Sequence, residues 1–297
     1  MSIRLNPDLL PSLLASIQQS QQNESVSTQE LASGRSVNQL SDNPAAAASL
    51  VQNHDQSAAD GQYLQSLSSL QSRYQVADSA LSNVVSALTR ALSLGTEGAN
   101  GTLNPADRQA IAGEVQGLLN QTVSLANTSY QGSFLFAGTK VTTQPFTLDS
   151  ATNTVTYDGN SATTSVALSN GDSITANVPG DQLFQNASGS VTSALTDLFN
   201  ALNSGNNIPS TITGVQNAIN QVSQQRVFYG NSLNQINQSE SFLNQDQLNL
   251  SQQENNLVGA NLASVASNFA QAQIANQATL NATAKVLGLP TLLDFLK

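Results

Sequence analysis

The chain has 297 residues, a formal net charge of −10 and only 9% charged residues, against about a quarter in an average soluble domain. Its acidic balance argues against nucleic acid or an anionic membrane as a partner. Because there is no cysteine and His54 is the single histidine, a Cys/His metal site is excluded. The first residues lack the apolar core and cleavage site of a secretory signal peptide, so the sequence predicts a cytoplasmic chain or one exported without a cleaved signal.

Two helices are predicted in the first third of the chain. The first is weakly apolar and runs from about Pro11 to Gly34, where glycine suits the position after the last turn. Asn43 can cap the second helix and Pro44 can begin it, and we expect it to end near Leu94. Its stretch Tyr63–Ala91 carries large apolar residues at alternating spacings of three and four. This stripe is the strongest coiled-coil signal in the chain.

The middle of the chain changes from helix to a small β insert. A glycine-rich loop is expected at Gly95–Gly101, followed by a third helix that ends near Tyr130. The insert runs from about Lys140 to Phe184 and contains two hairpin-turn signals, Asp158-Gly159 and Asn170-Gly171. Because isolated hairpins are marginally stable, the insert must form a sheet of several strands or lie on the helices.

A second long apolar seam occupies the last third, from about Thr211 to Val286. Every seventh residue is apolar: Val215, Val222, Tyr229, Ile236, Leu243, Leu250 and Leu257. Such a stripe needs a helical partner, and the Tyr63–Ala91 stripe is the natural one. If continuous, this helix would be on the order of 100 Å long, although the phase of its apolar positions shifts after Leu257. The uncharged stretch Asn255–Ala284 carries too many amides for a membrane span.

No residue pattern indicates catalysis. His54 next to Asp55 is the only possible source of a nucleophile-base pair, and its place on a helix favours a packing or surface histidine. The acidic residues are scattered, and Gly95–Gly98 lacks the preceding strand and the lysine of a phosphate loop. We therefore expect no enzyme and no catalytic, cofactor-binding or metal-binding residues.

Several motifs resemble one known family. Leu31–Asn38, followed by Ser41–Ala46, resembles the amino-terminal signature of bacterial flagellins. Within that superfamily, Gly132–Thr139 is similar to an element of the hook-associated, junction-type members, and Val178–Gly180 and Leu292–Leu296 fit the same group. The resemblance implies a mainly α fold with long coiled-coil helices that pair the N- and C-terminal segments, plus a small β-rich insert domain.

The resemblance also implies three domains. Residues 1–42 and 260–297 would form an inner terminal coiled-coil domain. Residues 43–138 and 186–259 would form a helical bundle, and residues 139–185 a β-rich outer insert that projects from the surface.

The implied role is a structural component of the bacterial flagellum. A homo-oligomeric ring would join a hook-side hook-associated protein to flagellin, without cofactor, nucleic acid or membrane. The chain would reach the outside of the cell through the flagellar type III route with an export chaperone. The alternative within the superfamily is a filament subunit, and outside it a coiled-coil chaperone or an adhesin. The candidate assembly and interface residues are Leu31, Gly34, Arg35, Asn38, Asp42, Asn43, Pro44, Phe134, Phe136, Gly138, Leu262, Val265, Phe269, Leu292, Leu293, Phe295 and Leu296.

Overall fold

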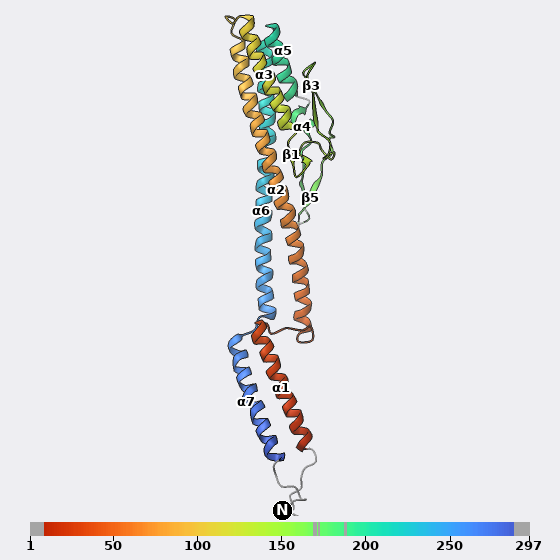
Figure 1. The fold of residues 1–297 in the computed structure, drawn as a ribbon, viewed down its shortest axis with the longest axis vertical. Coiled ribbons are helices and arrows are strands. Elements are labelled where there is room, and N and C mark those ends of the chain that lie inside the picture. Colours follow the sequence, from red (N-terminus) through yellow and green to blue (C-terminus); the bar gives the residue numbers. More distant parts are fainter. Residues whose placement is uncertain (1–8, 169–170, 172, 187–188, 288–297) are drawn as a thin grey trace, which may run out of the picture. The chain divides into compact units, whose positions relative to one another are not determined.

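The structure is a computed structural model that describes residues 9–168, 171, 173–186 and 189–287. The chain divides into two compact units. We call Ala59–Gln245 the central unit, and Met1–Ala58 with Asp246–Lys297 the terminal unit. The described residues are mainly helical, as the sequence predicts, and two helices contribute to both units (Figure 1): α2 (Pro44–Gly98) and α6 (Ile208–Val258).

In the central unit, α2 and α6 pack along the two stripes that the sequence predicts. Five successive heptad positions of α6 are fully or almost fully buried: Val215, Val222, Tyr229, Ile236 and Leu243. The rings of Tyr74 and Tyr229 meet edge to face with their centroids 4.9 Å apart. Beside them, the Arg226 Nε donates to the Asp78 Oδ1 at 2.8 Å. The predicted pairing of the two seams is therefore confirmed.

The α2 helix continues past Leu94 to Gly98, beyond the point where the sequence predicts a loop. A Cβ on Gly98 would lie 2.1 Å from a methyl carbon of Leu202, and one on Gly95 would lie 3.1 Å from Leu198. These glycines let α5 (Val191–Ser204) approach α2 closely. Their composition suggests a turn, but in this fold they serve helix packing.

The third helix, α3 (Pro105–Ala126), ends four residues before the predicted Tyr130. Four two-stranded antiparallel pairs and one short helix follow it. Their bounds are β1 (Ser129–Tyr130), β2 (Ser133–Phe134), β3 (Phe146–Asp149), β4 (Thr154–Tyr157), β5 (Ser165–Ala167), β6 (Ser173–Thr175), α4 (Gly180–Phe184), β7 (Gln185–Asn186) and β8 (Gly189–Ser190).

Only one of the two predicted hairpin turns joins paired strands. The β5–β6 pair turns around Gly171, as predicted. The interpretation of Asp158-Gly159 is wrong, because β4 pairs backwards with β3 and not forwards with β5. The turn between β3 and β4 instead contains Asn153 with a positive φ of 55°, a conformation that asparagine tolerates.

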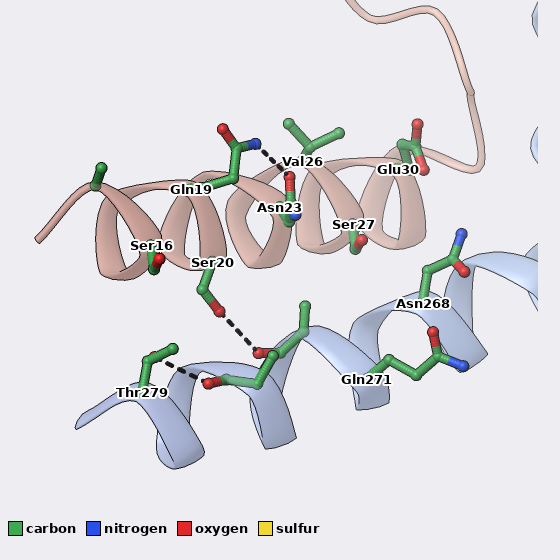
Figure 2. Close-up of a pocket in the computed structure, with 13 residues that line it drawn as sticks. Ser16, Gln19, Ser20, Asn23, Val26, Ser27, Glu30, Asn268, Gln271 and Thr279 are labelled. Atoms are coloured by element: carbon green, nitrogen blue, oxygen red, sulfur yellow. Dashed lines mark hydrogen bonds between the residues drawn. The ribbon is translucent and has the colours of Figure 1, made fainter. Parts of the chain in front are cut away.

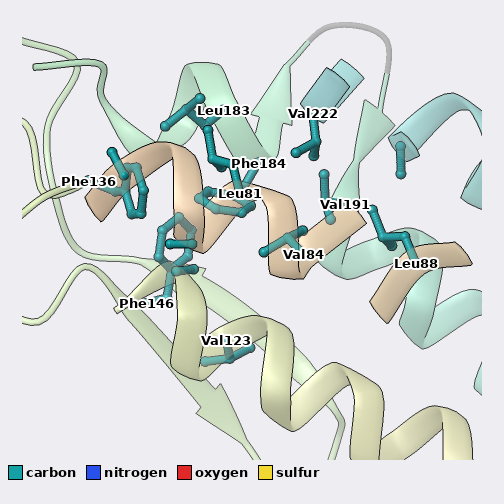
Figure 3. Packing of buried hydrophobic residues seen from close by; sticks show 14 of the residues in the cluster. Leu81, Val84, Leu88, Val123, Phe136, Phe146, Leu183, Phe184, Val191 and Val222 are labelled. Atoms are coloured by element: carbon teal, nitrogen blue, oxygen red, sulfur yellow. The ribbon is translucent and has the colours of Figure 1, made fainter. Parts of the chain in front are cut away.

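The β insert lies on the helices and shares their hydrophobic core (Figure 3). Phe184 meets Phe136 and Phe146 edge to face, at centroid distances of 5.6 and 5.2 Å. The Tyr74 hydroxyl on α2 donates to the carbonyl oxygen of Thr175 on β6. Burial raises the pKa of Tyr74 to about 12, which keeps this hydroxyl protonated at neutral pH. The expectation that a marginal insert must lean on the helices is borne out by these contacts.

The long helix expected from Thr211 to Val286 is divided in two. The α6 helix ends at Val258, and α7 (Leu262–Leu287) begins after three intervening residues, with the Asn261 side chain accepting from the Ser264 amide at 3.2 Å. Gly259 occupies the break, where a Cβ would lie 2.3 Å from the Asn255 carbonyl oxygen. The shift in apolar phase after Leu257 was the sequence signal of this break.

We predict that Phe184→Ala destabilises the helices and the β insert together. Removing a fully buried phenylalanine costs about 3–5 kcal/mol of unfolding free energy, and this ring belongs to a core that both parts share. Urea unfolding followed by far-UV circular dichroism should show the loss. The control Phe242→Ala removes a 60% exposed ring and should change stability by about 0.5 kcal/mol or less. Faster hydrogen exchange in the insert with an unchanged helical transition would contradict the shared core.

Candidate assembly surface

The terminal unit contains a helix pair with a polar interface. The α1 helix (Leu9–Ser33) lies along α7. Between them, the Ser20 hydroxyl donates to the Ala272 carbonyl at 3.3 Å, and the Asn276 amide donates to the Glu24 carboxylate at 2.8 Å. Val265 is the only large apolar side chain of α7 that is fully buried among those described. The pair therefore buries little apolar surface within one subunit.

An open groove of about 910 Å³ runs between α1 and α7 (Figure 2). Hydroxyls, amides and alanines line most of it, with Glu30 as its single charged residue. Ser16, Ser20 and Ser27 face it from α1, and Asn268 and Gln271 from α7. Such a lining can pack closely against another uncharged helix and offer hydrogen bonds to it.

The connection between α1 and α2 and the connection between α6 and α7 run side by side in opposite directions. Arg35 and Gly259 form an antiparallel bridge, in which the Ser36 amide donates to the Val258 carbonyl at 2.7 Å and the Ala260 amide donates to the Gly34 carbonyl at 2.9 Å. Gly34 has a φ of +70°, which favours glycine. We call the segments Gly34–Ser36 and Val258–Ala260 the clasp.

An ion pair and a small apolar cluster support the clasp. The Arg35 guanidinium lies 3.0 Å from the Glu254 carboxylate, and both side chains are about one-third exposed. Val37, Ala46 and Val258 are buried together beneath it. The clasp thus joins two segments that are more than 200 residues apart in the sequence.

The loop between α1 and α2 is held by its own side chains. The Asp42 carboxylate accepts from the amides of Asn38 and Gln39 at 2.9 and 2.8 Å. The Asn43 side chain accepts from the Ala46 amide at 3.0 Å, which confirms the predicted cap. This ordered loop leaves the side chain of Leu40 75% exposed.

Exposed large apolar side chains are concentrated in the terminal unit. Within the described part of the chain, three belong to the central unit: Val227, Phe228 and Phe242. The other exposed members all lie in the smaller terminal unit: Leu14, Val26, Leu31, Leu40, Val51, Leu248, Leu262, Ile274 and Leu280. These side chains remain available for contact with another molecule.

The structure brings most of the sequence-predicted residues of the terminal segments together. Gly34 and Arg35 belong to the clasp, and the exposed Leu31 precedes it on α1. On α7, Leu262 is exposed and Phe269 is half-buried. Asn38, Asp42, Asn43 and Pro44 form the adjoining loop and the start of α2, whereas Leu292, Leu293, Phe295 and Leu296 lie outside the described residues.

The three candidates from the insert lie elsewhere. Phe136 has no exposed surface, and Phe134 is half-buried at the β1–β2 pair. Gly138 has a φ of +69°, and a Cβ there would lie 2.1 Å from the Asn160 carbonyl oxygen. The Phe136 and Gly138 positions therefore serve packing inside one subunit rather than its surface, which the motif alone did not reveal.

Sequence reasoning missed the polar partners at this surface. Glu24 and Asn276 meet across α1 and α7, and Glu254 pairs with Arg35. Each lies among many other polar residues in its own segment and is not distinguished from them by the sequence. Only the shift of helical phase near Gly259 could have pointed to the region.

Metal-ligating side chains do not cluster in the described part of the chain. No group of three or more His, Asp or Glu side chains among them could hold a metal ion. His54 and Asp55 are both exposed on α2. No helix in the described ranges is long and apolar enough to cross a membrane.

Two family models match the chain: the bacterial flagellin N-terminal helical region over residues 11–141, and the C-terminal helical region over residues 212–296. Flagellar hook-associated protein 3 of Salmonella typhimurium is 29% identical over 286 residues, and that of Escherichia coli is 26% identical over 287. Each match covers 88% of this chain and 89% of the relative.

The crystal structure of flagellar hook associated protein-3 from Legionella pneumophila has the same fold. It superimposes with a TM-score of 0.64 at 16% identity, covering 69% of this chain and 98% of that one. The two matched helical regions contain α2, α3 and α7 and nearly all of α1 and α6. The chain therefore belongs to the bacterial flagellin family, on its hook-associated protein 3 branch.

Proposed function

We propose that the chain connects the flagellar hook to the filament as a ring of identical subunits. As a member of the hook-associated protein 3 branch, it is a structural component of the bacterial flagellum. The observation that carries the finer proposal is the large share of exposed apolar side chains that the terminal unit holds. A monomer gains nothing from them, whereas neighbouring copies can bury them.

The helix pair α1/α7 supports a role as the contact between copies. Its own interface is made by Ser20, Glu24 and Asn276, and its groove is lined by small and amide side chains. Neither helix covers its apolar residues, such as Leu14 and Ile274, within the subunit. We infer that residues 1–42 and 260–297 form the inner assembly domain, with residues 43–138 and 186–259 as the bundle and 139–185 as the outer insert.

The proposed partners follow from the same surface. A hook-side hook-associated protein would contact one edge of the ring and flagellin the other, since flagellin shares the helical regions that this chain matches. A chaperone that covers the exposed apolar residues before export would keep the free subunits apart. We propose export through the flagellar type III route without a cleaved signal, to a final place at the hook-filament junction outside the cell.

Deleting the gene is expected to leave cells with hooks but without filaments, and to release flagellin into the medium. A missing junction subunit removes the surface on which flagellin assembles. Electron microscopy of the cells and immunoblotting of the medium measure both effects, with restoration by the wild-type gene as the control. Normal filaments on the deletion strain would contradict the junction role. A loss of filaments without release of flagellin would instead indicate a filament subunit.

In the dilute monomer, we expect the α1 and α7 amides to exchange hydrogen much faster than those of the central unit. The pair buries few apolar groups, which do not offset a backbone ordering cost of roughly 1–2 kcal/mol per residue. Hydrogen exchange with mass spectrometry on monomer and on isolated hook-filament assemblies measures this difference. Equal protection of Leu262–Leu287 in both samples would show that the helix pair is already stable alone.

Replacing an apolar residue of α7 by an acid should permit secretion but block assembly. Phe269→Asp places a carboxylate in a packed interface, and we expect about tenfold less protein on hook-filament assemblies at unchanged levels in the medium. Leu262→Asp should act in the same way. The control Gln277→Asp adds the same charge at an exposed amide of the same helix and should assemble normally. Equal loss from Gln277→Asp would show that charge alone, and not the apolar stripe, matters.

A further inference from the structure

The clasp is the only place in the described terminal unit where the connection before α2 and the connection after α6 bond to each other through the backbone. Arg35 and Gly259 are antiparallel partners, and two backbone hydrogen bonds of 2.7 and 2.9 Å flank them. Helix α1 ends just before the clasp, and helix α7 begins just after it. Any motion of one connection is therefore shared by the other while the clasp is closed.

The helix pair beyond the clasp needs such a link, because its own contacts are weak. Two interhelical hydrogen bonds, Ser20 to Ala272 and Asn276 to Glu24, are the polar contacts that the structure shows between α1 and α7. When the two helices are apart, water can form hydrogen bonds with the same hydroxyl, amide and carboxylate groups. Each interhelical hydrogen bond therefore adds little net stability. Pairing of two such helices depends on how high their effective concentration is.

We propose that the clasp is a tether that keeps α1 and α7 next to each other in the single subunit, so that a neighbouring molecule can bind both helices together. By fixing the C-terminal end of α1 beside the start of α7, it raises the effective concentration of one helix at the other and removes part of the ordering cost before any partner binds. A partner then binds to two neighbouring helical segments and not to two separate ends of the chain. This inference concerns the single subunit and stands apart from the identity of its neighbours.

The local residue types fit this role better than that of a plain connection. Gly34 adopts a left-handed conformation, and Gly259 leaves room for the Asn255 carbonyl that a Cβ would meet at 2.3 Å. The Arg35–Glu254 ion pair spans the clasp at 3.0 Å. Two glycines and one ion pair thus fold both connections into the same bridge.

Disulfide trapping in the purified full chain tests the tether. Because the chain has no cysteine, Ser20→Cys with Ala272→Cys introduces the only two thiols, at positions that face each other across α1 and α7. The rate of disulfide formation in oxidised glutathione then reports the effective concentration of one helix at the other. Adding Arg35→Glu sets two carboxylates against each other at the clasp and should slow trapping about fivefold, the size of one exposed ion pair.

Matched variants separate the tether from general effects. The reciprocal exchange Arg35→Glu with Glu254→Arg should restore the rate, and Gly259→Ala should slow it without changing charge. Arg90→Glu breaks a more exposed ion pair with Glu114 in the central unit and should leave the rate unchanged. Gly230→Ala is the glycine control, because a Cβ there meets nothing within 4 Å.

Far-UV circular dichroism of every variant verifies that the helices remain folded. Slow trapping in both clasp variants, with restoration by the reciprocal exchange and normal controls, supports the tether. Equal rates in all folded variants would overturn it, and so would a slow rate that the reciprocal exchange fails to restore.

Discussion

The packing of α2 against α6 is the interaction on which the rest of the structure depends. Tyr74 contributes to it twice, with its ring against Tyr229 and with its hydroxyl bonded to the Thr175 carbonyl of the insert. Because the same seam carries the core that receives Phe136, Phe146 and Phe184, the insert cannot be positioned without it. The two helices also extend into the terminal unit, where their ends carry the segments that form the clasp.

The two units distribute apolar residues in opposite ways. In the central unit the heptad positions of α6 are buried almost completely, which stabilises a single chain by roughly 1.5–3 kcal/mol for each large side chain. In the terminal unit, Leu250 and Leu257 continue the same heptad but are only half-buried. A side chain left partly in water contributes less to folding and remains available for contact with another molecule. One repeat is therefore fully used for stability in one unit and leaves partly exposed leucines in the other.

The sequence predicted the elements whose signals are periodic and long. The stripes of α2 and α6, the Asn43 cap and the helical pattern of the ends needed only spacing and capping chemistry. It failed where a local signal has two meanings: Gly95 and Gly98 resemble a loop but permit close packing to α5, and Asp158-Gly159 resembles a hairpin turn but follows a strand paired with β3. The clasp could not be predicted because its two hydrogen bonds join backbone groups more than 200 residues apart, and its glycines and its ion pair form no periodic pattern in either segment.

The order of elements along the chain determines when the core can form. Contacting residues of the α2 and α6 stripes, such as Asp78 and Arg226, are 148 residues apart in the sequence. The amino-terminal half therefore cannot complete its core while the carboxy-terminal half is still missing. Contacts between such distant segments form slowly, because the chain loses the entropy of closing a long loop before the contacts stabilise it. A chain made or moved from its amino end therefore remains open until nearly all of it is present. The separation of the two stripes along the sequence therefore delays completion of the core.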